Sequence, residues 1–143
     1  MLDRVILHCD CNSFFASVEC AMRPELWQYP VAVAGDPESR HGIILAKNEL
    51  AKKAGVQPAE PIWQAKRKCP NLICVSAHFD AYHDFFERIN KIYLDYTDLV
   101  EPFSIDESFL DLTGCMHLHP GKTPRDIADE LRERVKEELG ITI

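Results

Sequence analysis

SIDESFLDL, at residues 104–112, is the most informative stretch of this sequence. Two short apolar runs flank the adjacent acids Asp106 and Glu107, a pattern typical of a β-hairpin with the acids at its corner. Adjacent carboxylates repel each other and resist burial, so their charge usually needs water, a donor or a metal ion. Taken alone, the pair is also compatible with a plain solvated turn.

A third acid, Asp10, follows another short apolar run at residues 5–9. Taken alone, Asp10 is a turn or capping residue. Three acids on neighbouring strand ends, however, would supply the hard oxygen ligands that Mg²⁺ prefers. The helix expected to begin near Ser13 would offer unpaired backbone N–H groups to a phosphate. Together these features predict a site for a divalent metal and a phosphate group.

The chain has 143 residues, 46% of them hydrophobic, which suits one domain or one compact domain with a lobe. No run of about 18 apolar residues occurs, and the N-terminus lacks the features of a secretory signal. We therefore expect a cytoplasmic protein with no membrane segment. Its six cysteines are then expected to be reduced thiols. A zinc site is an alternative at two places, although neither spacing is standard: His8, Cys9 and Cys11, or Cys115, His117 and His119.

The formal net charge of −7 argues against a free-standing DNA-binding domain. Residues 40–68 nevertheless carry seven Lys or Arg and two Glu, a local net charge of +5. A basic lobe beside an acidic body fits an anionic ligand held against a metal-binding acid cluster. On charge alone, an ordinary solvated face explains this distribution equally well.

Apolar periodicity and breaker residues predict an alternation of strands and helices. The expected strands are residues 5–9, 31–34, 43–46, 72–75, 100–105 and 109–113, and the expected helices are 14–22, 49–55, 61–69, 79–96 and 124–139. Residues 141–143 resemble the first half of a further strand, which suggests a truncated chain. The fold class is α/β or α+β, and the hairpin favours a mixed or antiparallel sheet with helices on one face.

Two runs resemble motifs of one enzyme family. HCDCNSFFASVE, at residues 8–19, is similar to the first motif of Y-family translesion DNA polymerases, and SIDESFLD, at residues 104–111, is similar to their central catalytic motif. Residues 42–61 and 69–72 match the fingers region in order and spacing. Within the family, the bacterial DNA polymerase IV and UmuC-like branches are the most similar.

The resemblance implies an α+β fold in which residues 1–12 and 79–143 form an incomplete palm and residues 13–78 form a small α/β fingers lobe. The thumb and little finger would be absent. Asp10 and Asp106 would bridge two Mg²⁺ ions, for which Mn²⁺ could substitute, and Glu107 would bind the catalytic metal. Cys11 would contribute only its backbone carbonyl.

The resemblance also implies a nucleotide site. The amides around Ser13 and Phe14 would hold the triphosphate, and Phe15 would be the steric gate against a ribose 2′-hydroxyl. Lys52 stands where the family has a phosphate-binding Arg, so it keeps the charge but loses bidentate geometry. The remaining contacts would form a loose roof over the nascent base pair: Leu45, Ala46 and Ala59.

Two positions depart from the family pattern. Asn12 replaces a common acid, although UmuC-like members carry Asn there too, and Asn is also a good helix N-cap. Glu49 replaces a phosphate-contacting Tyr. Because an acid facing a triphosphate would repel it, we expect Glu49 to turn away or nucleotide affinity to be reduced.

The implied function is template-directed DNA synthesis in damage tolerance, with dNTP and primer–template DNA as partners and location at the bacterial nucleoid. A sliding clamp would bind through the missing C-terminal part, and the fragment alone would be inactive. One alternative is a phosphatase of the haloacid-dehalogenase type, whose Asp-x-Asp motif is incomplete at residues 10–12. Another is a non-catalytic palm-like interaction module, which the retention of three acids disfavours.

Overall fold

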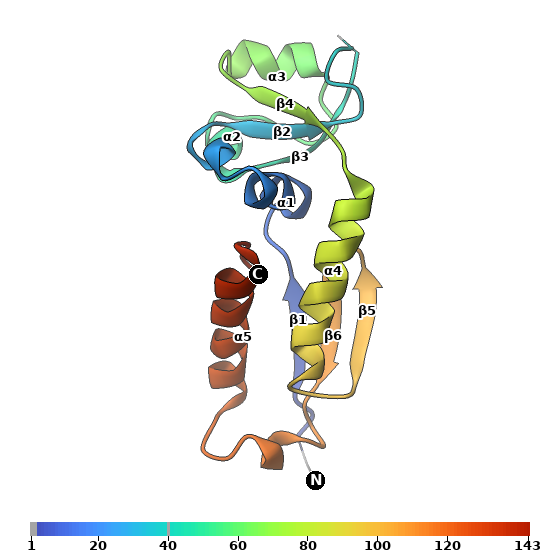
Figure 1. The fold of residues 1–143 in the computed structure, drawn as a ribbon, viewed down its shortest axis with the longest axis vertical. Coiled ribbons are helices and arrows are strands. Elements are labelled where there is room, and N and C mark those ends of the chain that lie inside the picture. Colours follow the sequence, from blue (N-terminus) through green and yellow to red (C-terminus); the bar gives the residue numbers. More distant parts are fainter. Residues whose placement is uncertain (1–2, 40) are drawn as a thin grey trace. The chain divides into compact units, whose positions relative to one another are not determined.

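The computed structural model describes residues 3–39 and 41–143, and the chain divides into two compact units (Figure 1). Unit 1 comprises residues 1–12 and 83–143, and unit 2 comprises residues 13–82. The helix α4 (Phe79–Leu94) begins in unit 2 and continues into unit 1.

Unit 1 is built on a three-stranded antiparallel sheet. The strand order is β1 (Ile6–Asp10), β6 (Glu107–Asp111) and β5 (Val100–Ser104). The chain then passes through the short 3₁₀ helix η2 (Met116–Leu118) into the helix α5 (Pro124–Leu139). The expected hairpin is confirmed, although β6 starts at Glu107 rather than Phe109 because residues 105 and 106 alone form the turn.

One face of this sheet packs against helices, and the opposite face carries the acids. Side chains alternate along each strand, and Ser108 and Leu110 are buried on the helix-covered face. There the Ser108 hydroxyl donates to Asn90 Oδ1 of α4 at 2.7 Å. On the other face, the His8 ring stacks on Phe109 at 4.5 Å. The predicted sheet with helices on one face is therefore confirmed.

Helix α5 is capped at both ends. The Thr123 hydroxyl accepts from the Asp126 amide, and the Asp126 carboxylate accepts from the Thr123 amide, which is a capping box. Gly140 ends the helix in the left-handed region, with φ of 73°, where glycine carries no Cβ penalty. The apolar face of α5 is buried, and it consists of Ile127, Leu131 and Val135.

Unit 2 is a mixed sheet covered by helices on both faces. The strand order is β3 (Ile44–Lys47), β2 (Val31–Ala34) and β4 (Ile73–Ser76), with β3 antiparallel and β4 parallel to β2. One face packs on α1 (Phe14–Met22) and the 3₁₀ helix η1 (Pro24–Gln28), and the other packs on α2 (Glu49–Lys53) and α3 (Ile62–Lys68). The two-sided packing follows from the alternation of side chains along β2. Val31 and Val33 belong to the apolar cluster on the α1 side, and Ala32 and Ala34 belong to the cluster on the α2 and α3 side.

Several expected element boundaries were wrong in detail; α2, for example, ends at Lys53 rather than Gly55. Residues 141–143 are not a strand, since the Thr142 carbonyl accepts the Asn12 amide, beyond the end of β1, without forming a ladder. Pro61 is the N-cap of α3 rather than its first helical residue. Helix α4 ends at Leu94 rather than Tyr96. Among the described residues, no helix is both long and apolar enough to span a membrane.

A buried ion pair in unit 2 predicts a pH-dependent stability. Glu60 is 8% exposed, accepts the Gln57 amide at 2.8 Å and pairs with Lys68 at 2.7 Å. Burial raises the pKa of Glu60, but Lys68 and the Gln57 amide outweigh it, so the pKa lies below its usual 4.5. A lowered carboxyl pKa stabilises the fold above the unfolded-state pKa, and this contribution is lost as pH falls through the folded-state pKa.

We expect Glu60→Gln to destabilise unit 2 by about 1–2 kcal/mol near neutral pH. The difference from wild type should shrink as pH falls through the lowered pKa of Glu60, because the carboxyl is then protonated in the folded and the unfolded state alike. Fluorescence of Trp27 and Trp63, both in unit 2, would follow thermal unfolding. The matched control is Glu38→Gln, an exposed glutamate of unit 2 outside any helix. An undiminished difference at low pH would contradict the prediction.

Candidate active site

The three predicted acids lie at one end of the sheet in unit 1. Asp10, the last residue of β1, is the register partner of Glu107, the first residue of β6. Asp106 precedes Glu107 in the two-residue turn, and its carbonyl accepts the Cys11 amide at 3.0 Å. This backbone hydrogen bond continues the contact between β1 and the hairpin by one residue, and so holds the two motifs together.

The carboxylates influence one another electrostatically. Burial raises the pKa of Asp10 above its usual 3.8, the charges of Asp106 and Glu107 raise it further, and His8 partly offsets them. Repulsion between like charges is relieved when a cation binds among them. The donor set, three carboxylates, fits a hard divalent cation.

The side chains of this cluster are engaged with polar neighbours. Glu107 Oε1 lies 3.0 Å from His8 Nε2, and the Ser104 hydroxyl lies 2.9 Å from both Asp106 Oδ1 and Glu107 Oε2. Within residues 3–39 and 41–143, no three His, Cys, Asp or Glu side chains are oriented so that they could hold one metal ion. The backbone thus brings the three acids together, and joint coordination requires their side chains to turn from these partners.

The cysteines near the acids are in surroundings that disfavour the thiolate form. Burial, followed by the charges of Asp106 and Asp10, raises the pKa of Cys11 to about 12, and burial raises that of Cys9 to about 11. Zinc binds the deprotonated thiolate, which these positions disfavour. At the other possible zinc site, Cys115 and His119 both contact the Tyr96 carbonyl, at 3.4 and 2.9 Å.

Asn12 contacts Thr142, a contact that the sequence around Asn12 does not predict. Its amide donates to the Thr142 carbonyl at 2.9 Å, and its side-chain nitrogen donates to the Thr142 hydroxyl at 3.0 Å. The residue that caps α1 is Ser13, which makes no side-chain capping bond. Asn12 therefore ties the end of β1 to the segment after α5, a partner 130 residues away that local pattern cannot reveal.

The predicted nucleotide-binding residues all lie in unit 2. Two of them, Ser13 and Ala59, have φ angles of 46° and 65°, and they are the described non-glycine residues with positive φ. Such backbone conformations cost free energy and cluster at functional sites. Phe14 and Phe15 open α1 directly after Ser13, and Phe14 is buried while Phe15 packs partly exposed against the core.

Two of the predicted roof residues, Leu45 and Ala46, lie at a bulge in β3. In β3, Ile44 pairs with Ala34 and Ala46 pairs with Val33, which leaves Leu45 without a register partner. Ala46 packs on the same cluster as Phe15, whereas Leu45 is 43% exposed. The structure thus brings Phe15 and Ala46 to one face of the sheet, and the bulge makes the direction of Leu45 unpredictable from simple alternation.

Lys52 and Glu49 lie on α2, which covers the opposite face of the sheet from α1. Both side chains are exposed. Glu49 occupies the first turn of α2, where a negative charge is favourable, and Lys52 occupies the last turn, where a positive charge is favourable. The helix itself therefore explains both charges, alongside the roles implied by the resemblance.

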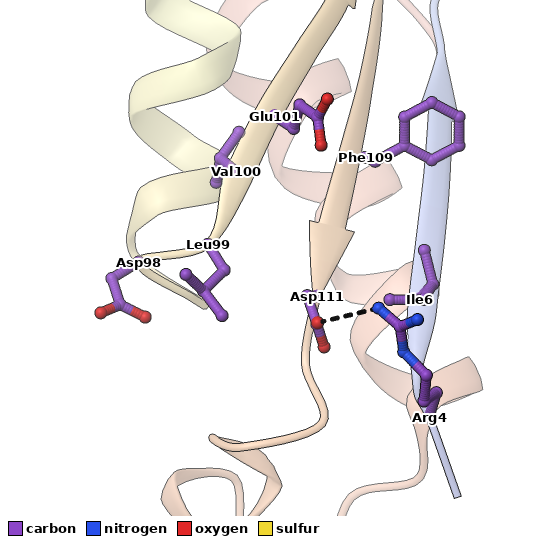
Figure 2. Close-up of a pocket in the computed structure, with 8 residues that line it drawn as sticks. All are labelled: Arg4, Ile6, Asp98, Leu99, Val100, Glu101, Phe109 and Asp111. Carbon is purple, nitrogen blue, oxygen red and sulfur yellow. Dashed lines mark ion pairs between the residues drawn. The ribbon is translucent and has the colours of Figure 1, made fainter.

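A separate hollow of about 550 Å³ lies at the other end of the unit 1 sheet (Figure 2). Ile6, Leu99 and Phe109 contribute apolar surface, and Arg4 reaches Asp111 at 3.8 Å. Two further acids, Asp98 and Glu101, also line it. This excess of acid is unfavourable for a phosphate backbone, so the hollow is not part of the candidate active site.

Solved structures with a similar fold include DNA polymerases. An insertion ternary complex of Dbh DNA polymerase matches with a TM-score of 0.85 and 28% identity, over 96% of this chain and 40% of that one. DinB from Sulfolobus solfataricus matches with a TM-score of 0.84 and 28% identity, over the same shares. A Y-family DNA polymerase chimera is also among the matches, with a TM-score of 0.86. The α+β fold and the resemblance to Y-family polymerases are confirmed.

The chain belongs to the impB/mucB/samB family, whose model matches residues 9–143. It is 51% identical over 142 residues to DNA polymerase IV of Acetivibrio thermocellus, covering 99% of this chain and 35% of that protein. It is 44% identical over 141 residues to DNA polymerase IV 2 of Bacillus subtilis, covering 99% and 34%. The chain thus spans about a third of the length of these curated relatives. Neither the phosphatase alternative nor the non-catalytic one is favoured by these matches.

Proposed function

We propose that this chain forms the catalytic palm and the fingers of a translesion DNA polymerase. Residues 1–12 and 79–143 would be the palm, and residues 13–78 the fingers. The reaction would be attack of a primer 3′-hydroxyl on the α-phosphate of a dNTP paired to a template, with pyrophosphate leaving. The partners would be dNTP and primer–template DNA, and a clamp contact remains a prediction outside this chain.

The register of Asp10 opposite Glu107, with Asp106 beside them, is the observation that carries the proposal. Two antiparallel strands bring a carboxylate from the first motif to a carboxylate pair from the second. The pKa of Asp10 is raised, first by burial and then by the charges of Asp106 and Glu107, which supports a common negative electrostatic potential around the three carboxylates. Such a potential attracts a divalent cation and the phosphates that accompany it.

Each residue group has a role that follows from its chemistry. Asp10, Asp106 and Glu107, with the Cys11 carbonyl, would hold two Mg²⁺ ions. When bound, these ions would stabilise the charge on the attacking and leaving oxygens. The amides around Ser13 and Phe14 would bind the triphosphate at the start of α1. Lys52 would add positive charge, and Leu45, Ala46 and Ala59 would leave space around the nascent pair.

The activity is testable in a hybrid polymerase, in which this chain replaces the matching residues of the Acetivibrio thermocellus relative. At 51% identity the two chains share most of their packing, so the hybrid is expected to fold. Template-directed primer extension with Mg²⁺ is the expected result. A folded hybrid that does not extend a primer, while the intact relative does, would refute the proposal.

Metal binding by the chain itself is a separate prediction. We expect Mn²⁺ to broaden the NMR signals of Asp10, Cys11 and Glu107 at concentrations that leave Leu118, in η2, unaffected. Binding should weaken as pH falls toward the raised pKa of Asp10, because a protonated carboxyl is a poor ligand.

The control for this experiment is Asp106→Ala, which should remove the selective broadening. Asp98→Ala, which removes an exposed acid at the distant hollow, should leave it unchanged. Equal broadening in all three proteins would show that the acids do not act as one site.

A further inference from the structure

A buried carboxylate in unit 2 has no role in the proposed chemistry. Glu19, on α1, is 0% exposed. Its Oε1 accepts two hydrogen bonds, from the Tyr82 hydroxyl at 2.7 Å and from His78 Nδ1 at 2.7 Å. Its Oε2 makes no hydrogen bond within the described part of the chain and lies 3.9 Å from Arg23 Nη2. Burying a partly satisfied carboxylate is costly, and an apolar side chain would fill this space at lower cost.

Tyr82, which donates this hydrogen bond to Glu19, also packs against the predicted steric gate, Phe15. The Tyr82 ring is 0% exposed and stacks on the Phe15 ring, with centroids 4.4 Å apart and planes inclined by 10°. Phe79 meets both rings edge-on, at 5.6 and 5.5 Å. The plane of Phe15 is therefore set by its packing on Tyr82. The Tyr82 hydroxyl in turn fixes the Tyr82 ring through its hydrogen bond to Glu19.

The protonation states suit this arrangement. Burial raises the pKa of Tyr82, and its hydrogen bond to Glu19 raises it further, so the hydroxyl keeps its proton and donates. A hydrogen bond to a carboxylate is shorter and stronger than one between neutral groups. Arg23 and His78 lie 3.9 and 2.7 Å from the Glu19 carboxylate. Both line a hollow of about 490 Å³ that also contains Ser76 and Cys74.

We propose that Glu19 is a positioning residue for sugar selection: it fixes the Tyr82 ring, and through that ring the orientation of Phe15. This rests on the proposed function, in which Phe15 is the gate against ribose. A carboxylate that touches no substrate would then contribute to the choice between dNTP and rNTP. The chain itself assigns this role, since Glu19, Tyr82 and Phe15 are all in unit 2 and in successive contact.

The test compares kcat/KM for dNTP and rNTP in the hybrid polymerase. Glu19→Ala and Tyr82→Phe should each lower the dNTP preference, by about tenfold, because each frees the same ring. The double variant should lose no more than either single one, since both act through one hydrogen bond. Glu19→Gln keeps an acceptor oxygen and should retain most of the preference.

The matched control is Glu60→Gln, which changes another buried carboxylate of unit 2 that pairs with Lys68 instead of an aromatic ring. It should lower thermal stability without changing the sugar preference. If Glu60→Gln shifts the preference as much as Glu19→Ala, instability is the cause and the proposal fails. It also fails if Glu19→Ala and Tyr82→Phe both discriminate as wild type does.

A second measurement separates this inference from the proposed function. In the chain alone, the Phe15 ring protons should show the upfield NMR shift of a stacked ring. Tyr82→Phe and Glu19→Ala should reduce that shift, and Glu60→Gln should not. An unchanged shift in both variants overturns the positioning role even in an active hybrid. A hybrid without polymerase activity refutes the proposed function instead, and leaves the positioning of Phe15 to be decided by the shift.

Discussion

Replacing Asp106 with alanine is expected to reduce primer extension by the hybrid polymerase about 1,000-fold or more. Removing one preorganised electrostatic partner of a transition state commonly costs about 10²–10³ in rate, and Asp106 would contribute to both metal positions. The expected loss is in kcat, measured by single-turnover extension at saturating dNTP, because the chemical step is the one affected.

The matched control for this experiment is Asp98→Ala. Asp98 is an exposed aspartate that lines the distant hollow of unit 1 (Figure 2). It should extend primers at the wild-type rate, within about twofold. Extension by Asp106→Ala within tenfold of wild type would mean that the three acids are not the catalytic centre, whatever their geometry.

Replacing Phe15 with alanine is expected to lower the preference for dNTP over rNTP about 100-fold. A ring packed against the sugar excludes a 2′-hydroxyl by steric conflict, so its removal admits ribonucleotides while leaving the metal site intact. The larger change should therefore appear in kcat/KM for rNTP, with kcat/KM for dNTP reduced much less. Parallel measurements with both nucleotides give the ratio.

Tyr29→Ala is the control for the gate. Tyr29 is an aromatic residue of unit 2 with 44% exposure, and it lies outside the Phe15 cluster of stacked rings. Its replacement should leave the sugar preference unchanged. If Phe15→Ala also leaves the preference unchanged, the gate assignment is wrong, and the inference about Glu19 loses its functional meaning.

The meeting of the two acidic motifs could be predicted from sequence because it depends on local signals. Apolar runs define β1 and β6, and the short turn between β5 and β6 leaves Asp106 and Glu107 at one end of the hairpin. Antiparallel pairing with β1 then brings Asp10 opposite Glu107. The same local logic holds for the Asn48 cap of α2 and the capping box of α5.

The features that could not be predicted depend on contacts distant in sequence. The bulge at Leu45 follows from pairing with β2, and the tie between Asn12 and Thr142 joins opposite ends of the chain. Glu19 is the sharpest case. At helical spacing it looks like a solvated charge, and only packing against α4 reveals that it is buried beneath Tyr82. Burial of a charged residue is decided by tertiary packing rather than by local pattern.

Because Glu107 must stay opposite Asp10, the number of residues in β6 is more strictly constrained than the identity of its side chains. Side chains alternate between faces with a period of two, so deleting one residue between Glu107 and Leu110 would turn Glu107 onto the helix-covered face. A conservative exchange at Phe109 would keep Glu107 opposite Asp10. Descendants of this sequence are therefore expected to vary in the side chains of β6 long before they gain or lose a residue within it.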